Sequence, residues 1–144
     1  MHDHLEPVHL PDYAEEFNMP YTAAIKVHAG KSVFISGVSA APVYHHHPHR
    51  RVEFDAVPED AGEQARLAIE NLRRIVEAAG GTLADIVQVT RYIRDVEINQ
   101  DAINRVTGLY FGAHRPTSTT VEVVRVATDP RLKFEISAIA IVPD

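Results

Sequence analysis

The strongest constraint on the fold of this chain is the order of its periodic segments. Residues 61–79 repeat apolar side chains at intervals of three and four, and residues 99–111 do so again, which predicts two helices. Residues 85–93 lie between them and alternate between apolar and polar side chains, as a half-buried strand does. Two strand-like runs precede the first helix and two follow the second. The order ββ-α-β-α-ββ predicts an α+β fold, a mixed sheet with both helices on one face.

Local signals support the ends of these segments. Asp60 can cap the first helix, Gly80-Gly81 can end it, and Gly112 can end the second. The predicted apolar positions are Ala65, Ile69, Leu72, Val76 and Ala79 in the first helix, Ile103, Val106 and either Leu109 or Tyr110 in the second, and Val87, Val89 and Ile93 in the strand between them.

The remaining strands are predicted from short apolar runs bounded by turn residues. Residues 23–27 and 32–36 are separated by a tetrapeptide that contains Gly30, which predicts a β-hairpin. Residues 119–126 and 132–141 are the last two strands, and the Asp129-Pro130 pair between them favours a turn.

Composition limits the classes of protein to which the chain can belong. A length of 144 residues predicts one domain, residues 21–144, preceded by an extended or loosely held arm over residues 1–20. A net charge of −6 argues against nucleic-acid binding, and the absence of cysteine excludes disulfides and thiolate chemistry. The sequence has no apolar run long enough for a membrane span and no recognisable export signal, so we expect a cytoplasmic protein.

A histidine-rich run lies in the long loop over residues 40–58. His45, His47 and His49 could bind a metal ion, because alternate residues of an extended chain point to the same side, and His46 would then point away. We favour a solvated or cleft-lining loop, since no helical metal-binding motif accompanies the run. No nucleotide-binding or flavin-binding motif is present either, and we expect no cofactor.

Four groups of residues together are similar to one family. These are Met19-Pro20-Tyr21, Phe34-Ile35-Ser36-Gly37, Ala102–Val106, and the pair Arg115–Val121 and Lys133–Ala140. In this combination the chain resembles the Rid family, also called YjgF-like or L-PSP proteins, over residues 20–142. The resemblance implies a chorismate-mutase-like subunit in a homotrimer around a central β-barrel, with substrate clefts between subunits. Oligomerisation also suits a sheet that has only two helices to cover it.

The resemblance implies a role for particular residues. Glu135 would position the attacking water, Asn104 and the Ser36-Gly37 backbone would align the substrate, Tyr21 would line the cleft, and Thr120 would contribute a hydroxyl group. Ser118 stands where the family carries the arginine that holds a substrate carboxylate. Another cation could bind the carboxylate instead, either Arg115, for which we favour a structural role, or Arg50 and Arg51 in the long loop.

Glu135 is a candidate without the resemblance as well. It alternates with Phe134 and Ile136 in an otherwise apolar strand, where a carboxylate is costly to bury. Beside a cleft, partial burial would raise its pKa and suit it to act as a general base. The alternative is a position on the solvent face of the sheet.

The resemblance implies an enamine or imine deaminase that acts on a small carboxylated metabolite between subunits and releases ammonia. The first alternative is a non-catalytic module that binds a small metabolite in the same cleft, and Ser118 favours it. The second is the endoribonuclease or translation-inhibitor activity after which some family members are named, and the negative net charge argues against it.

Overall fold

The computed structural model describes residues 2–144, which form six strands, two long helices and three short 3-10 helices. In chain order the elements are β1 (Leu5–Val8), η1 (Glu15–Phe17), β2 (Ala24–Val27), β3 (Lys31–Val38), η2 (Arg51–Phe54), α1 (Ala61–Ala78), η3 (Leu83–Asp85), β4 (Ile86–Arg94), α2 (Val96–Phe111), β5 (Thr117–Val123) and β6 (Phe134–Val142). The predicted order is confirmed from β2 onward, and β1 is an additional strand.

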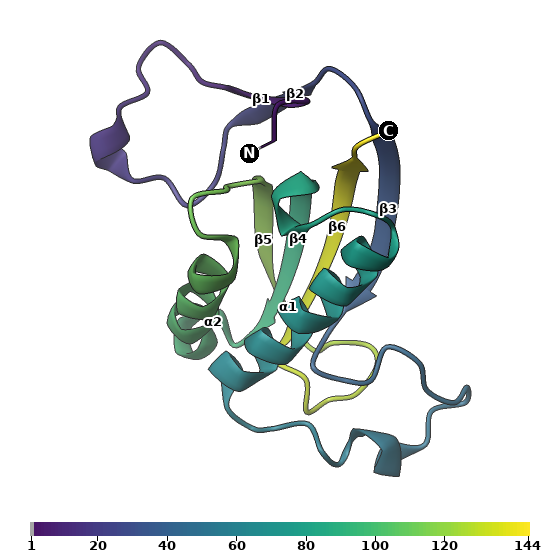
Figure 1. Cartoon of the computed structure of the whole chain (residues 1–144). Coiled ribbons are helices and arrows are strands. Elements are labelled where there is room, and N and C mark those ends of the chain that lie inside the picture. The colour runs from purple at the N-terminus through teal and green to yellow at the C-terminus, as the bar shows by residue number, and fades with distance from the viewer. Residues whose placement is uncertain (1) are drawn as a thin grey trace.

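The main sheet contains four strands in the order β3-β6-β4-β5. β6 pairs antiparallel with both β3 and β4, whereas β4 and β5 are parallel, so the sheet is mixed. Both α1 and α2 lie on the same face of this sheet (Figure 1). The predicted α+β fold is therefore confirmed. β3 and β5, the strands with the candidate residues Ser36 and Ser118, lie at opposite edges.

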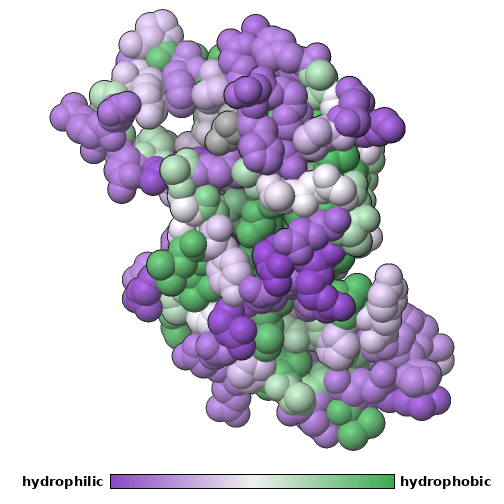
Figure 2. Space-filling view, viewed as in Figure 1, coloured by the Kyte–Doolittle hydropathy of each residue, from purple (hydrophilic) through white to green (hydrophobic). Residues whose placement is uncertain are grey.

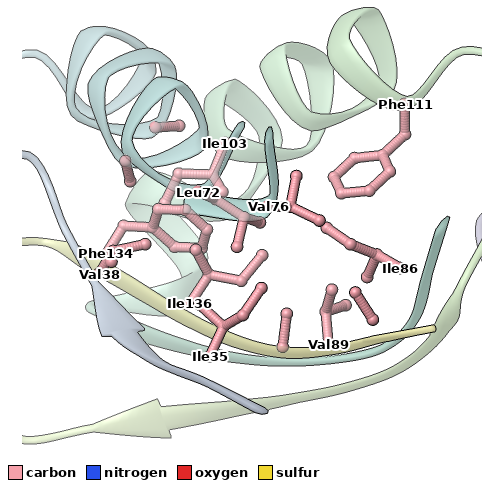
Figure 3. Packing of buried hydrophobic residues seen from close by; sticks show 14 of the residues in the cluster. Ile35, Val38, Leu72, Val76, Ile86, Val89, Ile103, Phe111, Phe134 and Ile136 are labelled. Carbon is pink, nitrogen blue, oxygen red and sulfur yellow. The ribbon is translucent and has the colours of Figure 1, made fainter. Parts of the chain in front are cut away.

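The core fills the space between the helices and this face of the sheet (Figure 3). The predicted apolar residues of α1 meet alternate residues of β6, since a strand turns every second side chain to the same side. Leu72 and Val76 are completely buried, as are Phe134 and Ile136. The other side of α1 carries ion pairs such as Arg73 with Glu77, and Figure 2 shows hydrophilic residues gathered over this helix.

The start of α1 is capped as predicted. The Asp60 carboxylate accepts a hydrogen bond from the backbone N–H of Glu63 at 2.9 Å, which satisfies one of the free donors of the first turn. Replacing Asp60 by Ala should lower the free energy of unfolding by about 1 kcal/mol. Urea denaturation measures this change. Asp60→Asn should retain most of the stability, and an equal loss in both variants would contradict the capping role.

The hairpin predicted for residues 23–36 is wrong. β2 pairs with β1 in a separate two-stranded sheet, and β3 pairs with β6 instead. Gly30 has φ +111, and a Cβ atom there would lie 2.7 Å from the side chain of Ile141. The glycine is thus needed where the chain passes closely over β6 from one sheet to the other, not in a two-strand turn.

Three details of the predicted elements also change. A register shift between Ile86 and Gln88 interrupts the alternation of β4, so Ile86 is completely buried and Val87 is only half-buried. α2 begins three residues earlier than predicted. Tyr110 packs against the core while Leu109 is 78% exposed, which decides between the two residues. Ala79 follows the end of α1 and is exposed.

The N-terminal segment is held against the rest of the chain rather than loose. β1 pairs with β2, Leu5 is only 5% exposed, and the ring of His4 hydrogen-bonds to the Ile141 carbonyl at 2.6 Å. The division into an arm over residues 1–20 and a domain over residues 21–144 stays a prediction.

The face of the sheet opposite the helices lacks a covering layer among residues 2–144. Phe34 on this face is 77% exposed, and the half-buried Ile139 lies beside it across the β3–β6 pair. This face is of mixed polarity, since Gln88, Thr90 and Ser137 also lie on it, and an uncovered sheet face with exposed apolar residues can bind another protein chain. None of the helices formed by residues 2–144 is long and apolar enough to span a membrane.

Candidate functional site

A groove of about 440 Å³ runs between β5, α2 and the segment before β2, and we call it the β5–α2 groove. Most of the residues that line it are polar. Five predicted site residues line it: Tyr21, Asn104, Arg115, Ser118 and Thr120. They meet because α2, which precedes β5, packs against the neighbouring strand β4, while the N-terminal segment passes the end of α2 and the start of β5 (Figure 1). The remaining lining residues include Arg91 and Gln100.

Arg91 is one of the two arginines that line this groove, the other being Arg115. It lies on β4 with Thr120 of β5 as its register partner, and in-register neighbours of parallel strands share a face of the sheet. Its Nη2 donates a hydrogen bond to Asn104 Oδ1 at 2.6 Å, and its guanidinium carbon lies 5.8 Å from the centre of the Phe134 ring. Arg91 is thus hydrogen-bonded to Asn104 and lies beside the hydroxyl-bearing strand β5.

The guanidinium of Arg91 has no anionic partner among residues 2–144. Its Nε atom is buried and unpaired, and burial lowers the pKa of Arg91 from its ordinary value with no carboxylate opposing the shift. An arginine remains charged in proteins nevertheless. A buried, incompletely paired cation is costly unless an anion binds beside it.

Arg91 is absent from the residues that the sequence motifs indicated. A signal was present, because Arg91 stands between Val89 and Ile93 on the apolar side of the alternating segment. A charged residue at an inward position of a strand indicates either a pairing partner or a ligand. No local pattern, however, indicates that this side chain opens into the same groove as Ser118.

Arg115, the cation considered from the sequence, has structural contacts. Its Nη1 donates to the carbonyl of Met19, while its own carbonyl accepts a hydrogen bond from Thr22 Oγ1. These bonds attach the N-terminal segment to the start of β5. Arg50 and Arg51 lie in the long loop and do not line the β5–α2 groove.

A second cavity of about 390 Å³ lies at the opposite edge of the sheet, and we call it the β3–β6 cavity. Ser36, Gly37 and Glu135 line it together with Tyr44 and His45 of the long loop. β3 has a register shift between Ile35 and Val38, so Ser36 and Gly37 lie in a bulge. Bulges often lie beside functional sites because they redirect the backbone.

Glu135 is half-buried in this cavity. Burial raises the pKa of its carboxyl group above the ordinary value of 4.5, with no compensating hydrogen bond from residues 2–144. Its side chain lies on the open face of the sheet, since Phe134 and Ile136 on either side point into the core. Glu135 therefore lies on the side of the sheet away from the helices and at the same time forms part of the wall of the β3–β6 cavity.

Gly37 makes room for the carboxyl group of Glu135. A Cβ atom at Gly37 would lie 2.9 Å from Glu135 Cδ and 3.0 Å from Oε1. Replacing Gly37 by Ala should displace the flexible end of Glu135 into solvent and lower its pKa towards 4.5, because less of the carboxylate is then buried. Stability should change by less than about 1 kcal/mol, since only a side-chain end has to move.

Carbon-13 NMR titration of the glutamate side chains measures this pKa. Gly108, which has open space around it, is the matched site, and Gly108→Ala should leave the titration of Glu135 unchanged. An unchanged pKa in Gly37→Ala would contradict the proposed contact.

The predicted site residues therefore fall into two groups that one chain cannot bring together. Ser118 and Thr120 are on β5 and face the helix side of the sheet, whereas Glu135 is on β6 and faces the open side. β4 separates the two strands, which corresponds to about 10 Å across the sheet. A site that contains residues of both groups requires a second copy of the chain.

Comparisons with known proteins give a consistent result. Residues 14–142 match the family model described as Endoribonuclease L-PSP. A 2-iminobutanoate/2-iminopropanoate deaminase of Salmonella typhimurium is 39% identical over 89 residues, which are 60% of this chain and 67% of that protein.

Two solved structures have the same fold. The TdcF protein of Escherichia coli with bound serine has a TM-score of 0.64 and 33% identity, over 85% of this chain and 88% of that one. A conserved Rid family protein of Yersinia pestis has a TM-score of 0.75 and 21% identity, over 96% of this chain and 99% of that one.

Proposed function

We propose a function from the finding that this chain belongs to the Rid family, the YjgF or L-PSP proteins. In this proposal the protein hydrolyses small 2-imino or 2-enamino acids and releases ammonia. The related Salmonella protein is a deaminase of two small imino acids, and TdcF binds serine, so both relatives act on or bind small carboxylated molecules. Imine hydrolysis consumes one water, breaks the carbon–nitrogen bond and yields a keto acid and ammonia.

The observation that carries this proposal is the unpaired guanidinium of Arg91 in the β5–α2 groove. A guanidinium presents parallel N–H donors that match the two oxygens of a carboxylate. Asn104 Oδ1 holds one N–H at 2.6 Å, which orients the group and leaves its other donors for a ligand. The hydroxyl groups of Ser118 and Thr120 line the same groove and can add neutral hydrogen bonds.

Arg91 thereby supplies the charge that Ser118 lacks. The resemblance to the family implies an arginine at the position of Ser118, which pairs in register with Val89 of β4. Arg91 lies two residues further along β4, on the same face. A side chain as long as arginine can reach this diagonal position. The carboxylate-binding cation has moved from one strand to its neighbour in this proposal.

Glu135 of a neighbouring copy is the group that we assign to the attacking water. The open sheet face gives the chain a surface for self-association, and a homotrimer with shared clefts is the arrangement that the family implies. A carboxylate with a raised pKa can accept the proton of water near neutral pH and return it to the leaving nitrogen. The Ser36-Gly37 bulge would border the reacting carbon, and Tyr21 would wall the other side.

Ammonia release tests the proposal. 2-Imino acids are generated in the assay by an amino acid oxidase, and the wild-type protein should accelerate ammonia release over spontaneous hydrolysis. An imine of similar size without a carboxylate should be a poor substrate, because Arg91 has nothing to bind. Equal rates on both substrates would overturn the role of the carboxylate.

Binding without turnover would favour the non-catalytic alternative. In that case a carboxylated ligand raises the melting temperature, since it binds only the folded state, but no ammonia is released. The endoribonuclease alternative has no support from charge, because the chain carries −6 and the groove contains two arginines, Arg91 and Arg115, rather than a basic surface.

A further inference from the structure

We propose that His45, His47 and His49 form a binding site for one divalent transition-metal ion of the zinc class. One nitrogen from each of the three rings lies within 4.8 Å of the other two. The ring centroids are 4.8 Å apart for His45 and His47, 4.9 Å for His45 and His49, and 5.0 Å for His47 and His49. Three imidazoles thus surround one point.

This arrangement is close to a zinc site. Zinc–nitrogen bonds of 2.0–2.1 Å in a tetrahedron correspond to about 3.4 Å between ligand nitrogens. His47 and His49 are exposed and their rings are therefore free to rotate, so small side-chain rotations close the remaining distance. Three histidine ligands leave a fourth position for water or an anionic group, as in many zinc sites.

The loop around the cluster is ordered by contacts that do not use the ring nitrogens of these three residues. His46, the fourth histidine of the run, points away: its Nδ1 lies 2.9 Å from Glu53 Oε1, and its backbone N–H donates to the same oxygen at 3.1 Å. Phe54 is buried and its ring lies 5.2 Å from His45 and 5.7 Å from His49, nearly edge to face. These contacts position the loop before any ion binds, so that binding has to order only the exposed histidine side chains, which lowers its entropic cost.

The ring nitrogens of this cluster are free to bind. His45 Nδ1 is buried and has no hydrogen-bond partner within residues 2–144, and coordination through this atom would satisfy it. The other three-residue cluster of potential ligands in this range, His2, His4 and Asp85, differs in this respect. There His2 bonds to Asp85 at 2.5 Å, His4 bonds to the Ile141 carbonyl at 2.6 Å, and Thr82 N–H bonds to Asp85 at 2.8 Å.

The surroundings of the cluster can accept a cation. Arg50 follows His49 and is unfavourable, but its side chain is exposed to solvent. The carboxylates of Glu53 and Asp55 lie in the same segment, where Glu53 contacts His46 and Asp55 pairs with Arg131. His45 also lines the β3–β6 cavity that contains Glu135. A bound ion would therefore border this cavity and attract anionic ligands to it, a property separate from the Arg91 groove at the other edge of the sheet.

Metal titration of tag-free protein tests the site. Isothermal titration with Zn²⁺ should give one ion per chain, and Co²⁺ should give the intense visible absorption of a four-coordinate site. His49→Ala and His47→Ala should each weaken Zn²⁺ binding by about 100-fold, since even partners of metal ligands contribute 10- to 100-fold. His46→Ala, from the same run but outside the cluster, should bind as the wild type does.

Two results would overturn the proposal. One is the absence of Zn²⁺ binding by the wild type at micromolar concentrations. The other is an equal weakening in His46→Ala and His49→Ala, which would indicate loose binding to a histidine-rich segment rather than a site. Circular dichroism and melting curves of each variant verify that it is folded, so that a loss of binding reports the missing ligand.

Discussion

Replacing Arg91 by Met should lower kcat/KM for 2-imino acids by about 100-fold, because two charge-assisted hydrogen bonds to the carboxylate contribute roughly 3 kcal/mol. Methionine retains much of the packing of the arginine stem against Phe134. It also removes a half-buried charge that has no anionic partner among residues 2–144, so the melting temperature should stay the same or rise. Lower activity together with unchanged or higher stability distinguishes a binding role from a structural one.

Two further variants make this prediction specific. Arg105 on α2 is exposed and does not line the groove, so Arg105→Met is the matched control and should keep wild-type activity. The double variant Arg91→Met/Ser118→Arg returns a guanidinium to the strand where the family resemblance places it. It should recover much of the lost activity. Equal activity of Arg91→Met and Arg105→Met would exclude Arg91 as the carboxylate-binding residue.

Replacing Glu135 by Gln should lower kcat by about 10²- to 10⁴-fold, since an amide cannot accept a proton from water. The wild-type rate should rise with pH through the pKa of Glu135, above 4.5, because the ionised carboxylate is the active form. This acidic limb should be missing from the residual activity of Glu135→Gln. A pH profile measured from about pH 4 to about pH 8 checks both statements.

Stability gives an independent measure of the same group. The pKa of Glu135 is raised in the folded state, so ionisation of its carboxyl group favours the unfolded state. Its ionisation therefore lowers the free energy of unfolding. This loss grows as the pH rises from the pKa of the unfolded state to that of the folded state, and it is constant at higher pH. Glu135→Gln should therefore melt at a higher temperature than the wild type at neutral pH, and the difference should vanish below the unfolded pKa. A lower melting temperature at neutral pH would mean that the ionised carboxylate is paired, contrary to its lack of a partner within residues 2–144 of one chain.

Mixing the two inactive variants tests whether a second copy completes the site. In a cyclic oligomer with shared sites, an equal mixture of Arg91→Met and Glu135→Gln chains should regain about a quarter of the wild-type activity after dissociation and reassembly. Each regained site takes Arg91 from one chain and Glu135 from the next. No recovery, in mixtures shown to contain hybrid oligomers, would mean that the two residues do not act in one shared site.

The amino-acid pattern predicted the helices, the order of the elements from β2 onward and most of the candidate residues of the two cavities, but neither β1 nor Arg91. Asp60, Leu72 and Val76 carry signals that depend on neighbours three or four residues away, and local spacing is sufficient to recognise them. The tetrapeptide motifs likewise identified Asn104, Ser118 and Glu135 without knowledge of any contact.

The pairing of the strands could not be predicted from local patterns, and the β5–α2 groove depends on this pairing. The apparent hairpin over residues 23–36 is divided between two sheets because Gly30 passes close to Ile141, a residue far away in the sequence. Arg91 and Ser118 share a groove because β4 and β5, which α2 connects, pair in parallel and turn both side chains to the same face of the sheet. The side chain of Glu135 on β6 points to the opposite face, so it lies outside this groove. The free energy of such pairings comes from burying side chains distant in sequence, so no local pattern in the chain records them.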